Sequence, residues 1–326
     1  MKVLIAGGAG YIGSHCVKMM MDLNYEVVVI DNLSTGHQAS INSKLYIGDI
    51  RDSQFLDQVF LQEKIDLVIH FCAKSLVGES VLKPLDYFDN NVYGTLQLLQ
   101  AMKKANVDKI VFSSSAAVYG EHEIMPITED FPTIPTNPYG ETKLMMEKMI
   151  KWAEKAYGLK YVSLRYFNVA GACEKGEIGE DHHPETHLIP LVLEVALGKR
   201  EKISVFGNDY PTKDGTCIRD YIHVSDLIEA HIQAALYLLN GGSSQIFNLG
   251  SENGFSVFEI IATAKKVTKR NIPYYVVERR AGDPAKLIAS SNKIKEVLGW
   301  VPKKTIEEIV QTAWEWHRKH PQGYEK

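Results

Sequence analysis

The glycine-rich segment at residues 7–13 constrains the fold of this chain more than any other feature. It reads Gly7-Gly8-Ala9-Gly10-Tyr11-Ile12-Gly13 and follows directly on an apolar run, Val3-Leu4-Ile5-Ala6. Glycines at positions 7, 10 and 13 permit a tight turn from a strand into a helix and close packing of that helix on the strand. A strand that ends in such a turn is typical of a parallel sheet with helices on both faces.

The N-terminal half of the chain continues this alternation of strand and helix. Short runs rich in β-branched residues recur, and longer amphipathic stretches separate them. Several of the runs are apolar throughout, which is typical of strands buried on both faces. We therefore expect an α/β fold with a doubly wound, parallel Rossmann-type sheet, whose strands lie at residues 3–6, 26–30, 44–47, 67–71, 109–113 and 160–164.

The pattern changes after about residue 167. A glycine- and histidine-rich segment at 171–187 precedes a helix predicted at 188–198, and a turn-rich loop at 207–215 follows. We expect a cofactor-binding domain at residues 1–166 and a smaller α/β substrate lobe at residues 167–326. The apolar run at Gln245–Leu249 is expected to return to the main sheet, and a surface-packed helix is predicted at 305–317.

Charge and hydropathy argue against several classes of partner. The 36 basic and 40 acidic residues give a net charge of −4, so no basic surplus attracts nucleic acid or an anionic membrane. The longest apolar runs are strand-sized, far below the roughly 20 residues of a membrane span. The N-terminal residues lack the pattern of a signal peptide. We expect a soluble, cytoplasmic protein that binds neither nucleic acid nor membrane.

The predicted strand at 26–30 is followed by an acidic residue that bears on the choice of cofactor. Asp31 lies 18 residues beyond Gly13, where a carboxylate accepts hydrogen bonds from an adenosine ribose. The segment 32–36 has no arginine to neutralise a 2'-phosphate. The sequence therefore predicts NAD rather than NADP, with its diphosphate at the helix N-terminus. Asp49 and Ile50, after the third strand, are candidates for its adenine end.

Tyrosine, lysine and serine residues suggest how a proton is handled beside this cofactor. Tyr139 and Lys143 lie four residues apart at the start of a helix predicted at 139–157, which places them on one helical face. A free phenol has a pKa near 10, and a neighbouring ammonium favours its anionic form. Ser115 ends a run of three serines after the fifth strand, where open α/β sheets bind ligands. We interpret these three residues as a catalytic set.

With these motifs the chain resembles the extended short-chain dehydrogenase/reductase family and, along almost its whole length, the UDP-glucose 4-epimerases within it. The likeness is carried by blocks such as Asp31-Asn32-Leu33, Val77-Gly78-Glu79-Ser80, Asn137-Pro138-Tyr139-Gly140, Phe206-Gly207-Asn208-Asp209-Tyr210 and Arg219-Asp220-Tyr221-Ile222-His223. The resemblance implies reversible, NAD-dependent epimerisation at C4 of UDP-glucose and UDP-galactose through a bound 4-keto sugar. It also implies a role in galactose metabolism and a homodimer, with an interface on the helices predicted at 91–105 and 139–157.

The resemblance also implies a role for each matching residue. Tyr139 matches the base, Lys143 the residue that lowers its pKa and contacts the nicotinamide ribose, and Ser115 the hydroxyl near the sugar O4. NAD contacts are implied for Gly7, Gly10, Tyr11, Ile12, Gly13, Asp31, Asn32, Asp49, Ile50, Phe71, Asn90, Lys143 and Phe167. Contacts to the nucleotide sugar are implied for Ser115, Tyr139, Asn168, Leu188, Phe206, Arg219, Arg280 and Asp283.

Some positions depart from the pattern of the family and leave alternatives open. Lys74-Ser75 and Thr186-His187 replace residues that other members use, and Leu287 stands where some members have a tyrosine that limits N-acetylated sugars. One alternative is an epimerase for UDP-N-acetylglucosamine or UDP-glucuronate. Another is a catalytically silent NAD-binding regulator, because a fold does not fix a function.

The spacing of the histidine and cysteine residues does not predict a metal site. Asp181, His182 and His183, with His187 nearby, lie in a proline-containing loop without a reliable ligand spacing, and the expected chemistry needs no metal. We therefore expect no metal site. The four cysteines are far apart and form no CxxC pair, so we expect free thiols at Cys16, Cys72, Cys173 and Cys217.

Overall fold

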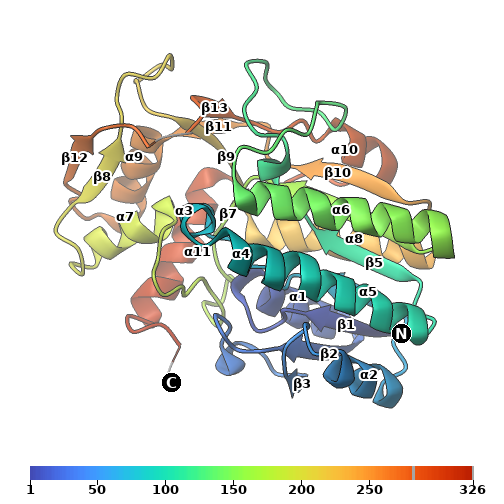
Figure 1. Cartoon of the computed structure of the whole chain (residues 1–326). Coiled ribbons are helices and arrows are strands. Elements are labelled where there is room, and N and C mark those ends of the chain that lie inside the picture. The colour runs from blue at the N-terminus through green and yellow to red at the C-terminus, as the bar shows by residue number, and fades with distance from the viewer. Residues whose placement is uncertain (281–282, 325–326) are drawn as a thin grey trace.

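The main layer of the protein is a seven-stranded sheet with helices on both faces (Figure 1). The computed structural model describes residues 1–280 and 283–324. The strand order is β10-β6-β5-β4-β1-β2-β3, and every neighbouring pair is parallel. The strands are β1 (Lys2–Ala6), β2 (Glu26–Asp31), β3 (Lys44–Ile47), β4 (Leu67–His70), β5 (Lys109–Ser113), β6 (Lys160–Tyr166) and β10 (Gln245–Leu249).

The predicted doubly wound parallel sheet is confirmed. All six strands that we predicted in the N-terminal half form, with ends that differ by at most two residues from the prediction. The run at Gln245–Leu249 does return to the main sheet, where it pairs with β6 at the edge. Apolar residues dominate these strands because both sheet faces are covered.

Alternate residues of the central strand β1 face the two halves of the core. Val3 and Ile5 pack in one cluster with α1 (Tyr11–Asp22), α8 (Val224–Leu239) and α10 (Asn292–Leu298). Leu4 and Ala6 pack in the other cluster with α2 (Ser53–Gln62), α5 (Gly94–Lys104) and α6 (Pro138–Tyr157). The two-residue period of a strand therefore assigns each apolar side chain to one helical layer.

Shorter helical segments connect the layers. They are α3 (Val77–Leu82), α4 (Pro84–Tyr87) and the turns at Gln38–Ser40, Phe88–Tyr93 and Ala116–Val118. None of the helices in residues 1–280 and 283–324 is both long enough and apolar enough to cross a membrane. The four cysteines are free, as expected.

The smaller lobe lies on the left of Figure 1 and has its own apolar core. One of its sheets joins β7 (Asn168–Ala170), β9 (Ile218–His223), β11 (Gly254–Ser256) and β13 (Lys286–Leu287), and the other pairs β8 (Ile203–Phe206) with β12 (Tyr274–Val277). The helices of this lobe are α7 (Leu188–Ala196), α9 (Val257–Thr268) and α11 (Ile306–Lys319). Because α8 and β10 pack in the main domain, our division at residue 166 describes the lobes only coarsely and stays a prediction.

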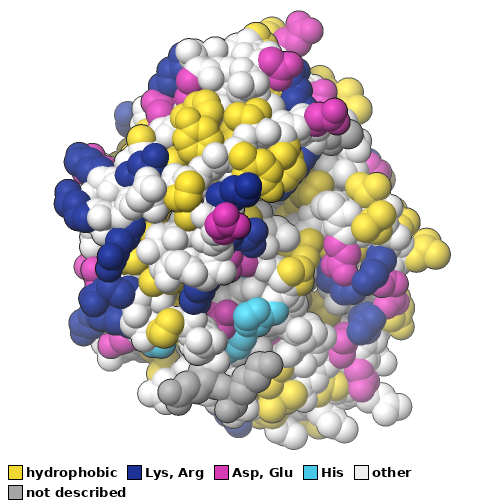
Figure 2. Space-filling model, turned by 90° about the vertical axis from the view of Figure 1, so that its left-hand side faces the viewer, with side chains coloured by type: hydrophobic (Ala, Val, Ile, Leu, Met, Phe, Trp, Pro, Cys, Tyr) yellow, Lys and Arg dark blue, Asp and Glu magenta, His cyan; other side chains and the backbone are white. Residues whose placement is uncertain are grey.

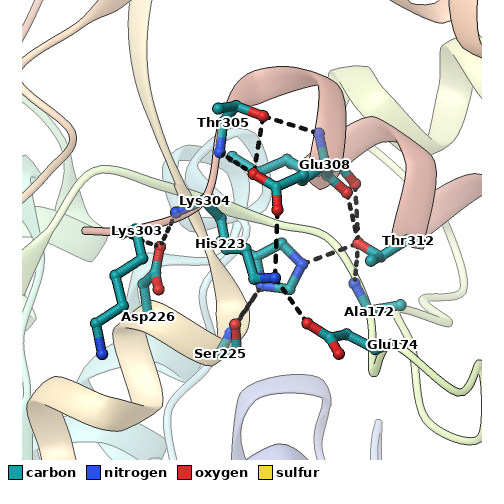
Figure 3. A network of polar contacts seen from close by, with 11 residues as sticks. Ala172, Glu174, His223, Ser225, Asp226, Lys303, Lys304, Thr305, Glu308 and Thr312 are labelled. Carbon is teal, nitrogen blue, oxygen red and sulfur yellow. Dashed lines mark hydrogen bonds and ion pairs between the residues drawn. The ribbon is translucent and has the colours of Figure 1, made fainter.

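A polar network joins the start of α8 to the start of α11 (Figure 3). His223 Nδ1 accepts a hydrogen bond from the Ser225 backbone N–H at 3.0 Å, and its Nε2 lies 2.9 Å from Thr312 Oγ1. Burial lowers the pKa of His223 to about 4, so this imidazole is neutral at neutral pH. Thr305 and Glu308 form a capping box at the first turn of α11. The network fixes α11 against the junction of β9 and α8.

We expect the helix-covered centre of the sheet to dominate stability. Leu4→Ala removes a side chain with no exposed area and should lower the free energy of unfolding by about 2–5 kcal/mol, measured by urea denaturation. The control, Leu61→Ala, changes a leucine that is 87% exposed and should have an effect within about 0.5 kcal/mol. Equal effects of the two substitutions would contradict this account of the core.

Candidate active site

The glycine turn after β1 has the geometry of an anion site. Gly7 has a φ of +82°, and a Cβ there would lie 2.7 Å from the Cys72 backbone nitrogen. A Cβ on Gly13 would lie 2.1 Å from Gly7 O, so the turn and α1 could not approach as they do. Gly10 is the N-cap of α1, and no side chain among the described residues caps it. The first backbone N–H groups of α1 therefore remain available to a diphosphate, which fits the predicted cofactor.

Asp31 supports the glycine turn from the end of β2. Its carboxylate accepts hydrogen bonds from the backbone N–H groups of Ala9 at 2.9 Å and Leu33 at 2.8 Å. Burial raises the pKa of Asp31, and these two hydrogen bonds oppose the rise. The predicted ribose acceptor thus also holds the diphosphate turn in place, so the two parts of the cofactor site are coupled through one carboxylate.

Next to Asp31, a second polar group lies at the ends of β2 and β3. Asn32 Nδ2 donates to Asp49 Oδ2 at 2.9 Å, and Arg51 Nη2 donates to the same oxygen at 2.8 Å. Arg51 holds the pKa of Asp49 well below its ordinary value. The neighbouring Ile50 is buried in the core. Sequence reasoning missed Arg51, although it stands two residues after a predicted contact.

The other expected cofactor residues lie at the carboxyl ends of strands, on α1 or, for Asn90, in the helical segment Phe88–Tyr93. The Tyr11 hydroxyl donates to Gly171 O at 2.7 Å, which ties α1 to the segment after β7. The ring centroids of Phe71 and His231 are 4.9 Å apart. Asn90 Nδ2 donates to Asn91 Oδ1 at 2.9 Å. Ile12 and Phe167 are partly buried side chains that pack against apolar clusters.

Helix α6 brings the predicted catalytic residues to the end of β5. It begins at Pro138, and the Asn137 side chain caps it by accepting a hydrogen bond from the Gly140 backbone N–H at 2.9 Å. A Cβ on Gly140 would lie 2.4 Å from Ala117 O, so glycine allows this close approach. Lys143 Nζ donates to Ser113 O at 2.8 Å and lies 5.8 Å from the centroid of the Tyr139 ring.

Burial controls the protonation of this set. Tyr139 is 8% exposed and Lys143 is 3% exposed. Burial raises the pKa of Tyr139, while a hydrogen bond with the Ser115 side chain acts in the opposite direction. Burial also lowers the pKa of Lys143 to about 7, although the charge of Glu147 opposes this shift. Since burial alone disfavours the phenolate, the role that we predicted for Lys143 stays a prediction.

A buried ion pair lies behind the catalytic residues. Glu147 accepts hydrogen bonds from Arg165 Nε at 2.9 Å and Nη2 at 2.6 Å, and from Ser114 Oγ at 2.6 Å. The side chains of Glu147 and Arg165 are each 5% exposed. Arg165 Nη1 also donates to the Tyr119 hydroxyl at 2.9 Å. Sequence reasoning missed this network; its only signal was a charged residue on a buried face of α6 and another within strand β6.

Four of the predicted substrate residues of the smaller lobe form two contacting pairs. The Arg280 guanidinium lies 3.9 Å from the centroid of the Phe206 ring. Arg219 Nη2 donates to Asp283 Oδ1 at 3.3 Å, and its side chain is only 14% exposed. The remaining two residues begin elements of the same lobe, Asn168 in β7 and Leu188 in α7. These residues are separate along the chain from the catalytic set, and that all of them contact the substrate stays a prediction.

The residues that depart from the family pattern include Lys74, His187 and Leu287, and each has a defined environment in the structure. Lys74 Nζ is 4.0 Å from Asp86 Oδ2, and the lysine side chain is 41% exposed. His187 is the N-cap residue of α7, and its imidazole contacts Glu180 and Glu185. Leu287 packs with Phe167 in a small apolar cluster.

Comparisons with known proteins agree with this architecture. The family model described as GDP-mannose 4,6 dehydratase matches residues 4–313. A UDP-glucose 4-epimerase of Lacticaseibacillus casei is 56% identical over 99% of each chain. The crystal structure of UDP-glucose 4-epimerase from Brucella ovis in complex with NAD is 45% identical, with a TM-score of 0.94 over 96% of this chain and 97% of that one.

A third relative extends the comparison to a nucleotide ligand. The UDP-glucose 4-epimerase of Bifidobacterium longum, solved in complex with NAD+ and UDP, is 40% identical, with a TM-score of 0.94 over 99% of this chain and all of that one. These matches confirm the resemblance seen in the sequence. The chain belongs to the UDP-glucose 4-epimerase family of the extended short-chain dehydrogenases/reductases.

Proposed function

We propose that this protein interconverts UDP-glucose and UDP-galactose by inverting C4 of the sugar through a bound 4-keto intermediate, with NAD as cofactor. The observation that carries the proposal is the meeting of Tyr139, Lys143 and Ser115 in a buried site where β5 and α6 approach each other. The glycine turn of β1 opens on the same carboxyl edge of the sheet. The relatives from Brucella ovis and Bifidobacterium longum are UDP-glucose 4-epimerases with the same fold, and both were solved with NAD.

The described residues fit NAD. When bound, NAD supplies a reversible acceptor for the hydride of the sugar C4. The N-terminus of α1 would hold the diphosphate, and Asp31 would accept hydrogen bonds from the adenosine ribose. Asn32 and Asp49, fixed by Arg51, would hold the adenine end. Lys143 would contact the nicotinamide ribose.

Tyr139 moves the proton in the proposed reaction. Its phenolate takes the proton of the O4 hydroxyl as the hydride leaves C4, and its phenol returns a proton to O4 when the hydride comes back on the opposite face. The Ser115 hydroxyl holds O4 beside the phenol. The Lys143 ammonium favours the phenolate by charge attraction. Because both Tyr139 and Lys143 are buried, bulk water has little access to the keto sugar.

The smaller lobe anchors the substrate far from its reacting carbon. Arg219 and Arg280 offer planar guanidinium groups that can each contact two diphosphate oxygens. The Phe206 ring packs against the Arg280 guanidinium, and Asp283 accepts a hydrogen bond from Arg219. An anchored UDP leaves the sugar free to turn over, so that either face of C4 can meet the cofactor. The intact catalytic set argues against a silent regulator.

We also propose a cytoplasmic homodimer that joins through α5 and α6. These helices lie side by side on one face of the molecule (Figure 1) and carry exposed apolar side chains. Leu96 is 39% exposed, Met145 37% and Trp152 67%. A second copy of the same surface would cover them by an isologous contact.

The first prediction concerns the base. Tyr139→Phe removes the proton acceptor and should lower kcat with UDP-galactose by at least about 10²–10⁴-fold, while NAD stays bound. Product formation and NAD released by denaturation are measured together, and Tyr157→Phe, on the same helix at an exposed position, is the control. A parallel assay of the wild type with an N-acetylated UDP-sugar tests whether such sugars are also substrates, a question that Leu287 leaves open. Near-normal turnover of Tyr139→Phe would overturn the assignment.

The second prediction concerns the lysine. Lys143→Met removes the ammonium, so the phenolate of Tyr139 becomes harder to form and the activity maximum should move to higher pH, with kcat about 10–10³-fold lower. The exposed Lys148 of the same helix provides the control substitution, Lys148→Met. A pH profile of kcat that matches the wild type would count against the proposed role of Lys143.

The third prediction concerns assembly. The combined change Leu96→Glu and Met145→Glu places two charges in the proposed interface and should halve the mass found by sedimentation equilibrium. Leu61→Glu changes an 87% exposed residue of α2, outside the proposed interface, and should leave the mass unchanged. A wild-type protein that sediments as a single chain, or a double variant that remains a dimer, would refute this interface.

A further inference from the structure

Four side chains between β7 and α7 meet at one point outside the catalytic set. They belong to Glu180, His182, Glu185 and His187, which we call the His/Glu cluster. One polar atom of each can be chosen so that all four lie within 4.8 Å of one another. The cluster is made of the residue types that bind transition-metal ions through imidazole nitrogen and carboxylate oxygen.

The separations within the cluster suit a single ion. His187 Nδ1 lies 2.8 Å from Glu180 Oε1 and 3.1 Å from Glu185 Oε1. His182 Nδ1 lies 3.2 Å from Glu180 Oε1 and 3.7 Å from Glu185 Oε2. A tetrahedral zinc ion with bonds of about 2.0–2.2 Å holds its ligand atoms roughly 3.3–3.5 Å apart. These four contacts are near that spacing, and the four polar atoms, which all lie within 4.8 Å of one another, would draw together around a bound ion.

The two carboxylates need positive charge from a source nearby. The side chain of Glu180 is 5% exposed and that of Glu185 is 9% exposed. Within residues 1–280 and 283–324, their ion pairs are with His182 and His187, and no lysine or arginine reaches them. Two buried anions are costly unless they are compensated. Protons on the two imidazoles provide this charge when no metal is bound, and a divalent cation would take their place, with both imidazoles then acting as neutral ligands.

His182 gives an independent sign of an incomplete site. Its Nδ1 is inaccessible to solvent and has no hydrogen bond of acceptable geometry in the described part of the chain, although it points into the cluster. Buried polar atoms without a partner are rare in native proteins. A metal ion in the centre of the cluster would satisfy this nitrogen.

The surroundings hold the cluster in shape and leave an entrance. Trp316 Nε1 donates to Glu180 O at 3.2 Å, and the ring of Tyr11 meets that of His182 edge-on, with centroids 6.2 Å apart. Histidine side chains are visible at the surface in Figure 2. His187 is 42% exposed, so the cluster can be reached from solvent. Such support by neighbouring residues is what a preorganised metal site requires.

We propose that the His/Glu cluster binds one divalent transition-metal ion of the zinc class, with Glu180, His182, Glu185 and His187 as its four ligands. Four protein ligands leave no open position, so the site is structural rather than catalytic. The ion would fasten the segment before α7 next to Tyr11. This proposal departs from our expectation of no metal site.

The test uses the full-length protein, stripped with a chelator and then titrated with Zn²⁺ alone. Calorimetry should find one Zn²⁺ per chain, and Co²⁺ should give the intense visible bands of a tetrahedral site. His187→Gln and Glu185→Gln each remove a ligand and should weaken Zn²⁺ binding by at least about 100-fold. His183→Gln changes a 71% exposed histidine of the same loop outside the cluster and should bind as the wild type does.

Thermal unfolding gives a readout that does not involve activity. Zn²⁺ should raise the Tm of the wild type and of His183→Gln, but not that of His187→Gln. Near-UV circular dichroism checks that each variant is folded, and Glu185→Gln replaces His187→Gln if the latter is not. The proposal is wrong if the stripped wild type binds no stoichiometric Zn²⁺, or if loss of a ligand leaves the affinity unchanged. Neither result would bear on epimerase activity.

Discussion

The site rests on the buried ion pair between Glu147 of α6 and Arg165 of β6. With each side chain 5% exposed, removal of one partner would strand a charge in the core, at a cost of about 3–5 kcal/mol. Tyr139, Lys143 and Glu147 are spaced four residues apart and therefore lie along one face of α6. Once Glu147 is fixed by Arg165 and Ser114, the rotation of the helix about its axis is fixed as well. Tyr139 and Lys143 must then face the end of β5.

Burial shifts the pKa values of Tyr139 and Lys143 in opposite directions. It raises the pKa of the Tyr139 phenol and lowers that of the Lys143 ammonium, because each group is more easily buried in its neutral form. A reaction that uses the phenolate and the ammonium therefore works against the preference of the site. The Ser115 hydroxyl and the charge of Glu147 oppose that preference from within the protein. The site thus excludes water, while Ser115 favours the charged form of Tyr139 and Glu147 favours that of Lys143.

Local signals predicted more of the fold than of the site. Apolar runs revealed the strands, and the amphipathic stretches between them revealed the helices, because these features depend on neighbours in the sequence. The pairings of Arg51 with Asp49 and of Glu147 with Arg165 were missed. Asp49 and Arg51 are only two residues apart, but no sequence signal shows that their side chains turn toward each other. Glu147 and Arg165 look like ordinary surface residues in the sequence and meet only because α6 packs on β6. His182 and His187 were weighed as metal ligands and a metal site was not expected, and Glu180 and Glu185 were not singled out, since the loop has no regular period from which side-chain directions follow.

The sequence by itself determined the parallel sheet, the glycine turn and the presence of tyrosine and lysine on one helical face. These follow from residue size, backbone freedom and periodicity, which act over a few residues. Only the tertiary structure decided which charges are buried and which partners compensate them. Burial and charge pairing depend on atoms distant along the chain. The roles of Glu147, Arg165 and the His/Glu cluster therefore become visible only when strands, helices and loop are packed together.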